Sequence, residues 1–441
     1  RWHRFEREYH NPRALAAVRQ GAREGTLLDV ANEHDFIEIL IDNLRRGETV
    51  IEGDSRLEFR CTDALLQQPL PLIEHVQPVE TEQSNSTTLV DNHYVIKIYR
   101  KLESGINPEV EVGRFLTEVA RFANSPQLLG SIELIEGERH SAVGIVHSYL
   151  QNQGDAWTVT SAYLDRFVEQ TRLLTDAGSA PESEDQTSYL RYIAQMGRRI
   201  AEMHVALASR DDIADFRPEP MTSGDVSTWI DEIVARADDV ANQLQRIRTT
   251  SSTLDNSRID ELLAKGKNLR LRLMQLARSA TEVLKIRHHG DLHLGQMLIV
   301  KDDIFIIDFE GEPRRPLSER RRKAPAARDV AGVVRSIDYS TTAALERALK
   351  IAPDERGKLA MALQLWRERA VATFLAAYRE HMSDPRLWPV DEEAANRLLD
   401  VFLLEKAFYE IGYEIAHRPD WVRVPLAGAL RVLSQAGEVT E

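Results

Sequence analysis

The chain has 441 residues, of which 43% are hydrophobic, and its 70 acidic and 56 basic side chains give a formal net charge of -14. This length exceeds that of one hydrophobic core, so two or three packed subdomains are expected. The acidic balance argues against nucleic acid or an anionic membrane surface as the main partner.

Cysteine usage and the lack of targeting signals narrow the cellular setting. Cys61 is the single cysteine, which excludes an internal disulfide framework. No apolar run is long enough to span a membrane, and the opening RWHRFERE lacks the apolar core of a signal peptide. We therefore expect a cytoplasmic protein. The chain opens at Arg1 rather than at methionine, which is compatible with a portion of a longer protein.

Residues 1–79 combine a helical stretch at 36–44 with short strand-like pieces such as 57–60 and a proline-punctuated run at 69–79. Mixed short elements of this kind are typical of a small α+β subdomain. We predict an N-terminal cap over 1–79.

Residues 80–153 are predicted to form a second subdomain that ends in a connector. Two β-runs lie around polar turns between 79 and 100, and a helix should begin after Asn107, because Asn is a good N-cap and Pro108 suits the first helical position. An apolar strand at 142–150 follows, and QNQGDAW at 151–157 breaks it. The remainder, 154–441, is mostly helical in period.

The strongest chemical signal is HGDLHLGQ at 289–296, followed after a predicted β-hairpin by DFE at 308–310. Gln296 lies five positions after Asp291, the spacing of the metal-binding asparagine in the kinase signature H-R-D-L-x-x-x-N, and Asp308 stands where D-F-G has its aspartate. Phosphoryl transfer needs a carboxylate at the acceptor hydroxyl and oxygen ligands for Mg²⁺. We predict Asp291 as the catalytic base and Gln296 and Asp308 as the metal ligands.

Two other interpretations of these residues are possible. Asp291 could cap a turn while Asp308 merely ends a buried strand, with the histidines bonding loop carbonyls. A zinc site from His288, His289, Asp291 and His293 is the other alternative, since these are good ligand types at close spacing, although no helix presents them on one face.

The residues expected to bind the nucleotide lie in the second subdomain, 80–153. Lys97 lies mid-strand in VIKIY, like the strand lysine of kinases that holds the α- and β-phosphates, and Glu111 is its preferred ion-pair partner, with Glu109 remaining possible. The polar run Gln83, Ser84, Asn85, Ser86 and Thr87 occupies the place of a phosphate-covering loop but has no glycine, so a simple polar turn is equally compatible. We expect adenine near Val146 and Tyr149 of the connector.

A stripe near the C-terminus could bind a sugar. Lys406, Tyr409 and Tyr413 lie at i, i+3 and i+7, along one helical face. Tyrosine offers an apolar ring face and a polar tip, which suits a sugar. Core packing is the alternative explanation for such a stripe.

With these residues assembled, the sequence resembles bacterial maltokinases, both free-standing and fused to trehalose synthase. The resemblance runs over nearly the whole chain and is carried by EQSNSTT at 82–88, NPEVEVGRFLTEVARF at 107–122, NQGDAW at 152–157, GRRIAEMHVAL at 197–207, HGDLHLGQ at 289–296 and DFEGEPRRPLSERRRKAPAARDVAGVVRSIDY at 308–339. These motifs are far narrower than the generic kinase pattern.

The resemblance implies an α+β, protein-kinase-like (aminoglycoside-phosphotransferase-like) bilobal fold with an N-terminal cap and a mostly helical C-lobe. It also implies transfer of phosphate from ATP, with Mg²⁺ as cofactor, to the anomeric hydroxyl of maltose, as a feed into α-glucan (glycogen) synthesis. The expected sugar contacts are His293, Lys406, Tyr409 and Tyr413. A trehalose synthase, fused or in complex, is the candidate protein partner.

Two other functions are compatible with the motifs. Kinases for an aminoglycoside, choline or another sugar share the pattern of Asp291, Gln296 and Asp308. A catalytically silent module that binds glucan or tethers trehalose synthase is the third possibility.

Overall fold

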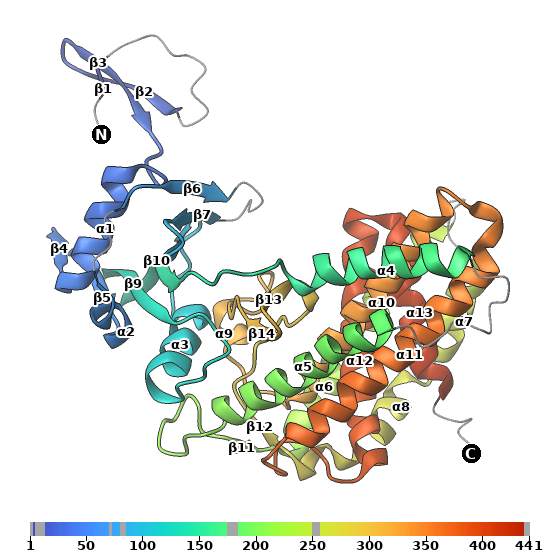
Figure 1. Ribbon diagram of the computed structural model, residues 1–441. Helices are drawn as coiled ribbons and strands as arrows, with labels where there is room; N and C mark the ends of the chain where they lie inside the picture. The colour runs from blue at the N-terminus through green and yellow to red at the C-terminus, as the bar shows by residue number, and fades with distance from the viewer. Residues whose placement is uncertain are drawn as a thin grey trace. The chain divides into compact units, whose positions relative to one another are not determined.

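The computed structural model describes residues 3–4, 14–69, 73–79, 85–173, 184–248 and 256–435 (Figure 1). They belong to two compact units, one with the residues up to 151 and 315–319, the other with 152–314 and those from 320 onward. In the described ranges, no helix combines the length and apolar character needed to cross a lipid bilayer.

The first unit is built on a seven-stranded antiparallel sheet in the order β4-β5-β9-β10-β8-β7-β6. Its strands are β4 (Thr49–Glu52), β5 (Ser55–Cys61), β6 (Val76–Val79), β7 (Asn85–Val90), β8 (Tyr94–Tyr99), β9 (Leu128–Glu136) and β10 (Arg139–Ser148). A separate three-stranded sheet has the order β1-β3-β2 and consists of β1 (His3–Arg4), β2 (Ala14–Gln20) and β3 (Arg23–Leu28).

Helix α1 (His34–Arg46) packs on the seven-stranded sheet, because its apolar residues recur at helical spacing and form one apolar face. Ile37, Leu40, Ile41 and Leu44 are all buried and belong to a core cluster that also contains residues of β5, β8, β9 and β10. The remaining helical elements of the unit are α2 (Asp63–Gln67), α3 (Pro108–Arg114), the π-helical turn η1 (Phe115–Val119) and the beginning of α9 (Leu317–Arg320).

The residues of the predicted cap, 1–79, contribute strands to two sheets. Strands β4, β5 and β6 belong to the same sheet as β7 to β10, and β5 pairs with β9 from Ser55↔Glu136 to Cys61↔Gly130. The sequence does not reveal this pairing, because a strand's partner cannot be read from a local pattern when it lies some seventy residues away, and the boundary at 79 stays a prediction. Within the described part of 1–79, the small β1-β3-β2 sheet is separate from the main sheet.

Local signals gave correct boundaries elsewhere in the first unit. The Asn107 side chain accepts hydrogen bonds from the backbone N–H groups of Glu109, at 2.8 Å, and Val110, at 3.3 Å, and Pro108 is the first residue of α3. The predicted N-cap is therefore confirmed.

The second unit is mostly helical (Figure 1). Its long helices are α4 (Ala156–Leu173), α5 (Glu184–Leu207), α6 (Ser223–Arg248), α10 (Ala327–Leu349), α11 (Arg356–His381) and α12 (Glu392–His417). Shorter helical elements are α7 (Asn256–Gly266), α8 (Leu269–Leu276), η2 (Ala277–Glu282), η3 (Leu294–Gln296), η4 (Pro353–Glu355), η5 (Pro419–Trp421) and α13 (Arg423–Gln435). Helix α10 is buried along most of its length and contacts α4, α11, α12 and α13.

Two two-stranded antiparallel sheets complete the second unit, β11 (Glu219–Pro220) with β12 (Leu284–Lys285) and the hairpin of β13 (Met297–Val300) with β14 (Asp303–Ile306). The second is the hairpin predicted between the two acidic motifs, with Val300 opposite Asp303, and it is confirmed. The polar stretches 176–187 and 249–257, whose composition is typical of surface loops, lie mostly outside the described residues.

The segment 152–155 is more than a connector, because it pairs with the β13–β14 hairpin. Gln153 N donates to Ile299 O at 2.8 Å, and Ile299 N donates to Gly154 O at 3.0 Å. Asp155 then caps α4, accepting from Thr158 N at 2.9 Å. The NQGDAW motif therefore fixes the hairpin and the start of α4 together.

Candidate active site

The loop that carries Asp291 is hydrogen-bonded to a buried carboxylate on α10. Asp329, 2% exposed, accepts hydrogen bonds from His289 N at 2.7 Å and Gly290 N at 2.9 Å. His204 Nε2 lies 3.1 Å from Asp329 Oδ2, and its Nδ1 lies 2.8 Å from the Tyr378 hydroxyl. Because the carboxylate can only accept, His204 donates from Nε2 to Asp329.

Burial alone would raise the pKa of Asp329, but its hydrogen bond with His204 and the nearby His288 hold that pKa below the ordinary value. Asp329 is therefore a buried anion at neutral pH, with the donors that such a charge requires. The sequence reasoning did not single out Asp329. Its signal was an isolated acid in the apolar, helix-periodic run PAARDVAGVV.

Two small residues of α10 let the loop lie directly on that helix. A Cβ added at Gly332 would come within 2.3 Å of the Leu292 carbonyl oxygen. One turn later, Ser336 Oγ accepts from Leu294 N at 3.1 Å. Glycine at 332 is therefore needed for close approach of the loop.

Lys406 of α12 reaches the same loop and sets the charge of Asp291. Its Nζ donates to Asp291 Oδ1 at 2.9 Å, and the Asp291 side chain is 24% exposed. Burial alone would raise the pKa of Asp291, but Lys406 and His293 hold it below its ordinary value. Asp291 is consequently ionised at neutral pH and can accept a proton from a hydroxyl placed against its exposed side.

Gln296 and Asp308, the expected metal ligands, lie side by side at the two ends of the hairpin. Gln296 Nε2 donates to Asp308 Oδ2 at 2.8 Å, and a carboxylate oxygen of Glu310 lies within 4.8 Å of one of Asp308. Carboxylate and amide oxygens are the donors that Mg²⁺ prefers, so the chemistry of this set fits the ion. Asp308 has φ +65°, a left-handed conformation that Asp tolerates better than most residues.

The hairpin turn is clamped onto α5. The Asp303 carboxylate accepts from Arg199 Nε at 2.8 Å, from Arg199 Nη2 at 2.6 Å and from Gln195 Nε2 at 2.7 Å. Two parallel bonds from one guanidinium fix orientation as well as distance. The clamp therefore helps to set the positions of Gln296 and Asp308 at the far ends of the two strands.

The zinc reading is not supported. His289 donates from Nε2 to Ile307 O at 2.9 Å, while His293 Nδ1 accepts from Gly295 N at 3.1 Å. His288 is 7% exposed, and burial lowers its pKa to about 4. Among the residues that the structure describes, these histidines and Asp291 do not form a group of metal ligands.

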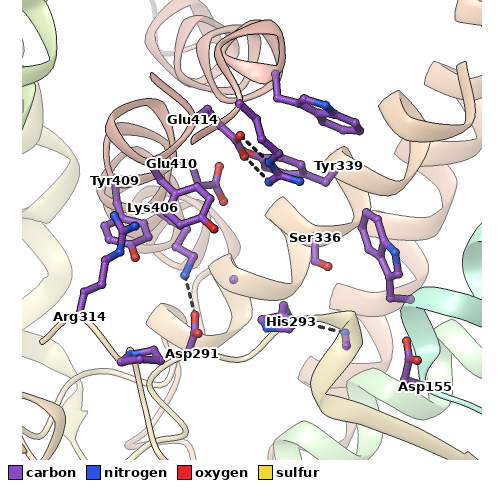
Figure 2. A pocket seen from close by; sticks show the side chains of 17 residues that line it. Asp155, Asp291, His293, Arg314, Ser336, Tyr339, Lys406, Tyr409, Glu410 and Glu414 are labelled. Atoms are coloured by element: carbon purple, nitrogen blue, oxygen red, sulfur yellow. Dashed lines mark hydrogen bonds and ion pairs between the residues drawn. The ribbon is translucent and has the colours of Figure 1, made fainter. Parts of the chain in front are cut away.

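A pocket of about 750 Å³ opens beside Asp291 (Figure 2). Its walls combine acids, bases and aromatic rings from the loop of Asp291, the segment after β14, the start of α4, α10, the C-terminal half of α12 and η5: Asp155, Trp157, Asp291, His293, Gly295, Pro313, Arg314, Gly332, Ser336, Tyr339, Lys406, Tyr409, Glu410, Tyr413, Glu414, Arg418 and Trp421.

The structure places all four expected sugar contacts, His293, Lys406, Tyr409 and Tyr413, on the wall of this pocket. The tyrosines are therefore not interior core residues. Cations lie over their rings, with Lys406 Nζ 5.2 Å from the Tyr409 centroid and the Arg314 guanidinium 4.7 Å from that of Tyr413. Burial lowers the pKa of His293, which is therefore neutral at neutral pH.

In the first unit, Lys97 forms an ion pair with Glu109, the alternative partner to the preferred Glu111. Lys97 Nζ lies 3.2 Å from Glu109 Oε2, which also accepts from the Tyr99 hydroxyl at 2.8 Å. Residues two apart on a helix are separated by about 200° of rotation, so Glu109 and Glu111 face opposite ways. Glu109 is 4% exposed and faces the sheet.

The predicted phosphate loop is partly a strand. Gln83 and Ser84 lie outside the described residues, and Asn85, Ser86 and Thr87 begin β7, with Thr87 opposite Lys97 in the ladder with β8. Asn85 and Ser86 are buried, and Ser86 Oγ accepts from Arg100 Nε at 3.1 Å. Residues 85–87 therefore belong to a strand and not to a loop, and their contact with phosphate stays a prediction.

The expected adenine contacts, Val146 and Tyr149, stay a prediction. Val146 is fully buried in the core cluster of the sheet, with Ile96 and Gly130 as its neighbours across the ladders, so its side chain is a core residue. Tyr149 lies just after β10, and its backbone N–H donates to His93 O at 2.8 Å. An apolar strand of this kind reads the same whether it lines a ligand or fills a core.

No family model matches the chain. A glucosamine kinase of Streptacidiphilus jiangxiensis is 27% identical over 353 residues, which cover 78% of this chain and 70% of that protein. A glucosamine kinase of Mycolicibacterium smegmatis is 27% identical over 365 residues, 82% of this chain and 81% of that protein. A solved structure of glucosamine kinase in complex with glucosamine, ADP and inorganic phosphate has a TM-score of 0.65 at 23% identity, over 95% of this chain and 87% of that chain.

The structural similarity confirms the predicted α+β, kinase-like fold. The two curated relatives confirm the predicted enzyme class, an ATP-dependent kinase. A maltokinase is a finer statement than these relatives support.

Proposed function

We propose that this protein is a sugar kinase that transfers the γ-phosphoryl group of ATP to the anomeric hydroxyl of maltose, giving maltose 1-phosphate and ADP. The observation that carries the proposal is the Asp291–Lys406 pair at one wall of a pocket lined by Tyr409 and Tyr413. A charged base beside aromatic surfaces suits a substrate that presents both a hydroxyl and apolar ring faces.

In this reaction Asp291 accepts the proton of the attacking hydroxyl, while the new P–O bond forms and the bond to the ADP oxygen breaks. Lys406 keeps Asp291 ionised between turnovers. Asp308 and Gln296 would hold Mg²⁺, which neutralises charge on the phosphate oxygens when bound. Lys97, oriented by Glu109, would bind the α- and β-phosphates.

The size of the pocket supports a disaccharide. Along α12, the lining residues from Lys406 to Glu414 span about 12 Å at 1.5 Å per residue. This exceeds one pyranose ring and suits two. The resemblance of NQGDAW and DFEGEPRRPLSERRRKAP to maltokinase motifs favours maltose among disaccharides, together with a cytoplasmic role in α-glucan synthesis and trehalose synthase as partner.

An amino sugar is the second candidate acceptor. Both curated relatives are glucosamine kinases. Four carboxylates, Asp155, Asp291, Glu410 and Glu414, line the pocket and could attract an ammonium group.

A panel of acceptors tests the proposal. With ATP and Mg²⁺, kcat/KM for maltose should exceed that for glucose, trehalose, glucosamine and kanamycin by at least about tenfold, since each 1.4 kcal/mol of extra binding to the second ring is a factor of ten. Product analysis by ³¹P NMR should place phosphate on the anomeric carbon. A higher kcat/KM for glucosamine or kanamycin would overturn the maltose assignment.

Glu109→Gln should raise the KM for ATP by about tenfold, because the charge-assisted bond that orients Lys97 is replaced by a neutral one. Glu111→Gln, two residues further along the same helix, is the matched control and should change that KM by less than about twofold. Equal effects of the two substitutions would contradict the assignment of Glu109 to Lys97.

A further inference from the structure

Lys406 forms an ion pair with one carboxylate and feels the charge of two others, as a bound ammonium ion in this pocket would. Its Nζ lies 2.9 Å from Asp291 Oδ1, and Glu312 and Glu410 are the next acids to act on it. Burial alone would lower the pKa of Lys406, but these three acids hold it above its ordinary value. The ammonium is therefore charged throughout the pH range in which the enzyme can be assayed.

Carboxylates around a pocket are the groups that recognise an amine on a ligand. Here the amine is supplied by the protein itself. Glu410 is also held by Arg335, at 2.8 Å from Nε and 2.6 Å from Nη2, and Glu312 bonds Tyr409. Glu414, further along α12, is bound by Arg418 at 2.7 and 3.0 Å. Three of these acids thus have a protein cation within ion-pairing distance: Asp291, Glu410 and Glu414.

We propose that Lys406 is the residue that restricts the acceptor to an uncharged sugar, by occupying the position in which the ammonium of an amino sugar would bind. The inference rests on the proposed sugar-kinase function. It accounts for an acid-rich pocket without requiring a cationic substrate.

The charge balance at this point is simple. With Lys406 in place, an acceptor ammonium next to Asp291 meets a like charge, which costs free energy. Without it, Asp291 and Glu312 lose that cation, and an amine on the sugar can take its place. The groups that face Lys406 from each packed element are Asp291 and His293 of the loop, Glu312 and Arg314 of the following segment, and Tyr409 and Glu410 of α12, with Arg335 of α10 behind Glu410.

The test compares glucose with glucosamine, which share one ring and differ by an ammonium group. Wild type at pH 7 should favour glucose by at least tenfold in kcat/KM, or in Kd from titration calorimetry where turnover is slow. In Lys406→Ala and Lys406→Gln, kcat/KM for glucose should fall far more than for glucosamine, so that the preference shifts toward glucosamine by at least tenfold. Lys265→Ala, which removes a lysine paired with Glu261 on α7, is the control and should leave the preference unchanged.

Raising the pH to deprotonate the sugar amine should act in opposite directions on the two proteins. Glucosamine should bind wild type more tightly and Lys406→Ala more weakly. The inference is overturned if wild type takes glucosamine as readily as glucose, or if both substitutions lower the two sugars by one common factor. If maltose is inert but glucose is still favoured over glucosamine, the maltose assignment fails and the role of Lys406 stands.

Discussion

Asp291→Asn is expected to lower kcat for phosphate transfer by about 100-fold to 10,000-fold, the usual contribution of a positioned general base. The substitution keeps the size of the side chain but removes the negative charge that accepts the hydroxyl proton. The substitution also removes the ion pair with Lys406 at 2.9 Å, so the positive charge of Lys406 no longer has a carboxylate to keep ionised. Initial rates at saturating ATP and sugar measure the effect directly.

The KM for ATP should change little in this variant, since Asp291 is assigned to the acceptor and not to the nucleotide. Asp302→Asn, an exposed aspartate in the turn of the β13–β14 hairpin, is the matched control and should retain wild-type kcat. A kcat for Asp291→Asn within threefold of wild type would remove Asp291 from its catalytic role.

The part of the site that the sequence predicted is the part encoded locally. Asp291, Gln296 and the hairpin before Asp308 are consecutive in the chain, so their spacing determines that Gln296 and Asp308 meet across two short strands. The stripe on α12 was also readable, since a helical period places Lys406 and Tyr409 on one face. The sequence does not show whether this face of the helix lines a pocket or packs into the core.

The rest depends on contacts between distant segments. Asp329 meets the catalytic loop across about forty residues, and the pairing of β5 with β9 spans some seventy, so neither has a local signature. Which face of helix α3 packs against the strand of Lys97 decides that Glu109 is its partner, and the sequence does not show that face. Val146 shows the same limit, because an apolar strand residue suits a core and a ligand site equally.

Asp329→Asn is the second substitution with a large expected effect, and it acts through position alone. The two carboxylate oxygens of Asp329 accept from three donors, His289 N, Gly290 N and His204 Nε2. An asparagine side chain would place its N–H₂ group against one of these three donors. It would also lack the negative charge to which the other two donate. We expect a loss of about 3 kcal/mol of unfolding free energy, because hydrogen bonds to a charged group contribute about 1.5–3 kcal/mol each and one buried donor is left without an acceptor.

Activity should fall further than stability explains. A shift of about 1 Å in a reacting group can cost on the order of 100-fold in rate, and His289 and Gly290 directly precede Asp291. We therefore expect kcat to drop about 100-fold in the folded fraction of Asp329→Asn, measured well below its melting temperature. Asp165→Asn, at an exposed ion pair with Arg347, should lose less than about 1 kcal/mol and retain full activity.

The pH dependence separates this account from a general loss of packing. The pKa of Asp329 is lowered in the folded protein, so its stabilising contribution is complete above the ordinary pKa of an aspartate and is lost as the pH falls toward the lowered value. The difference in unfolding free energy between wild type and Asp329→Asn should therefore be constant near neutral pH and shrink in acid. A difference that stays constant into acid would mean that the carboxylate charge of Asp329 does not stabilise the loop, and the anchoring role would have to be assigned to shape alone.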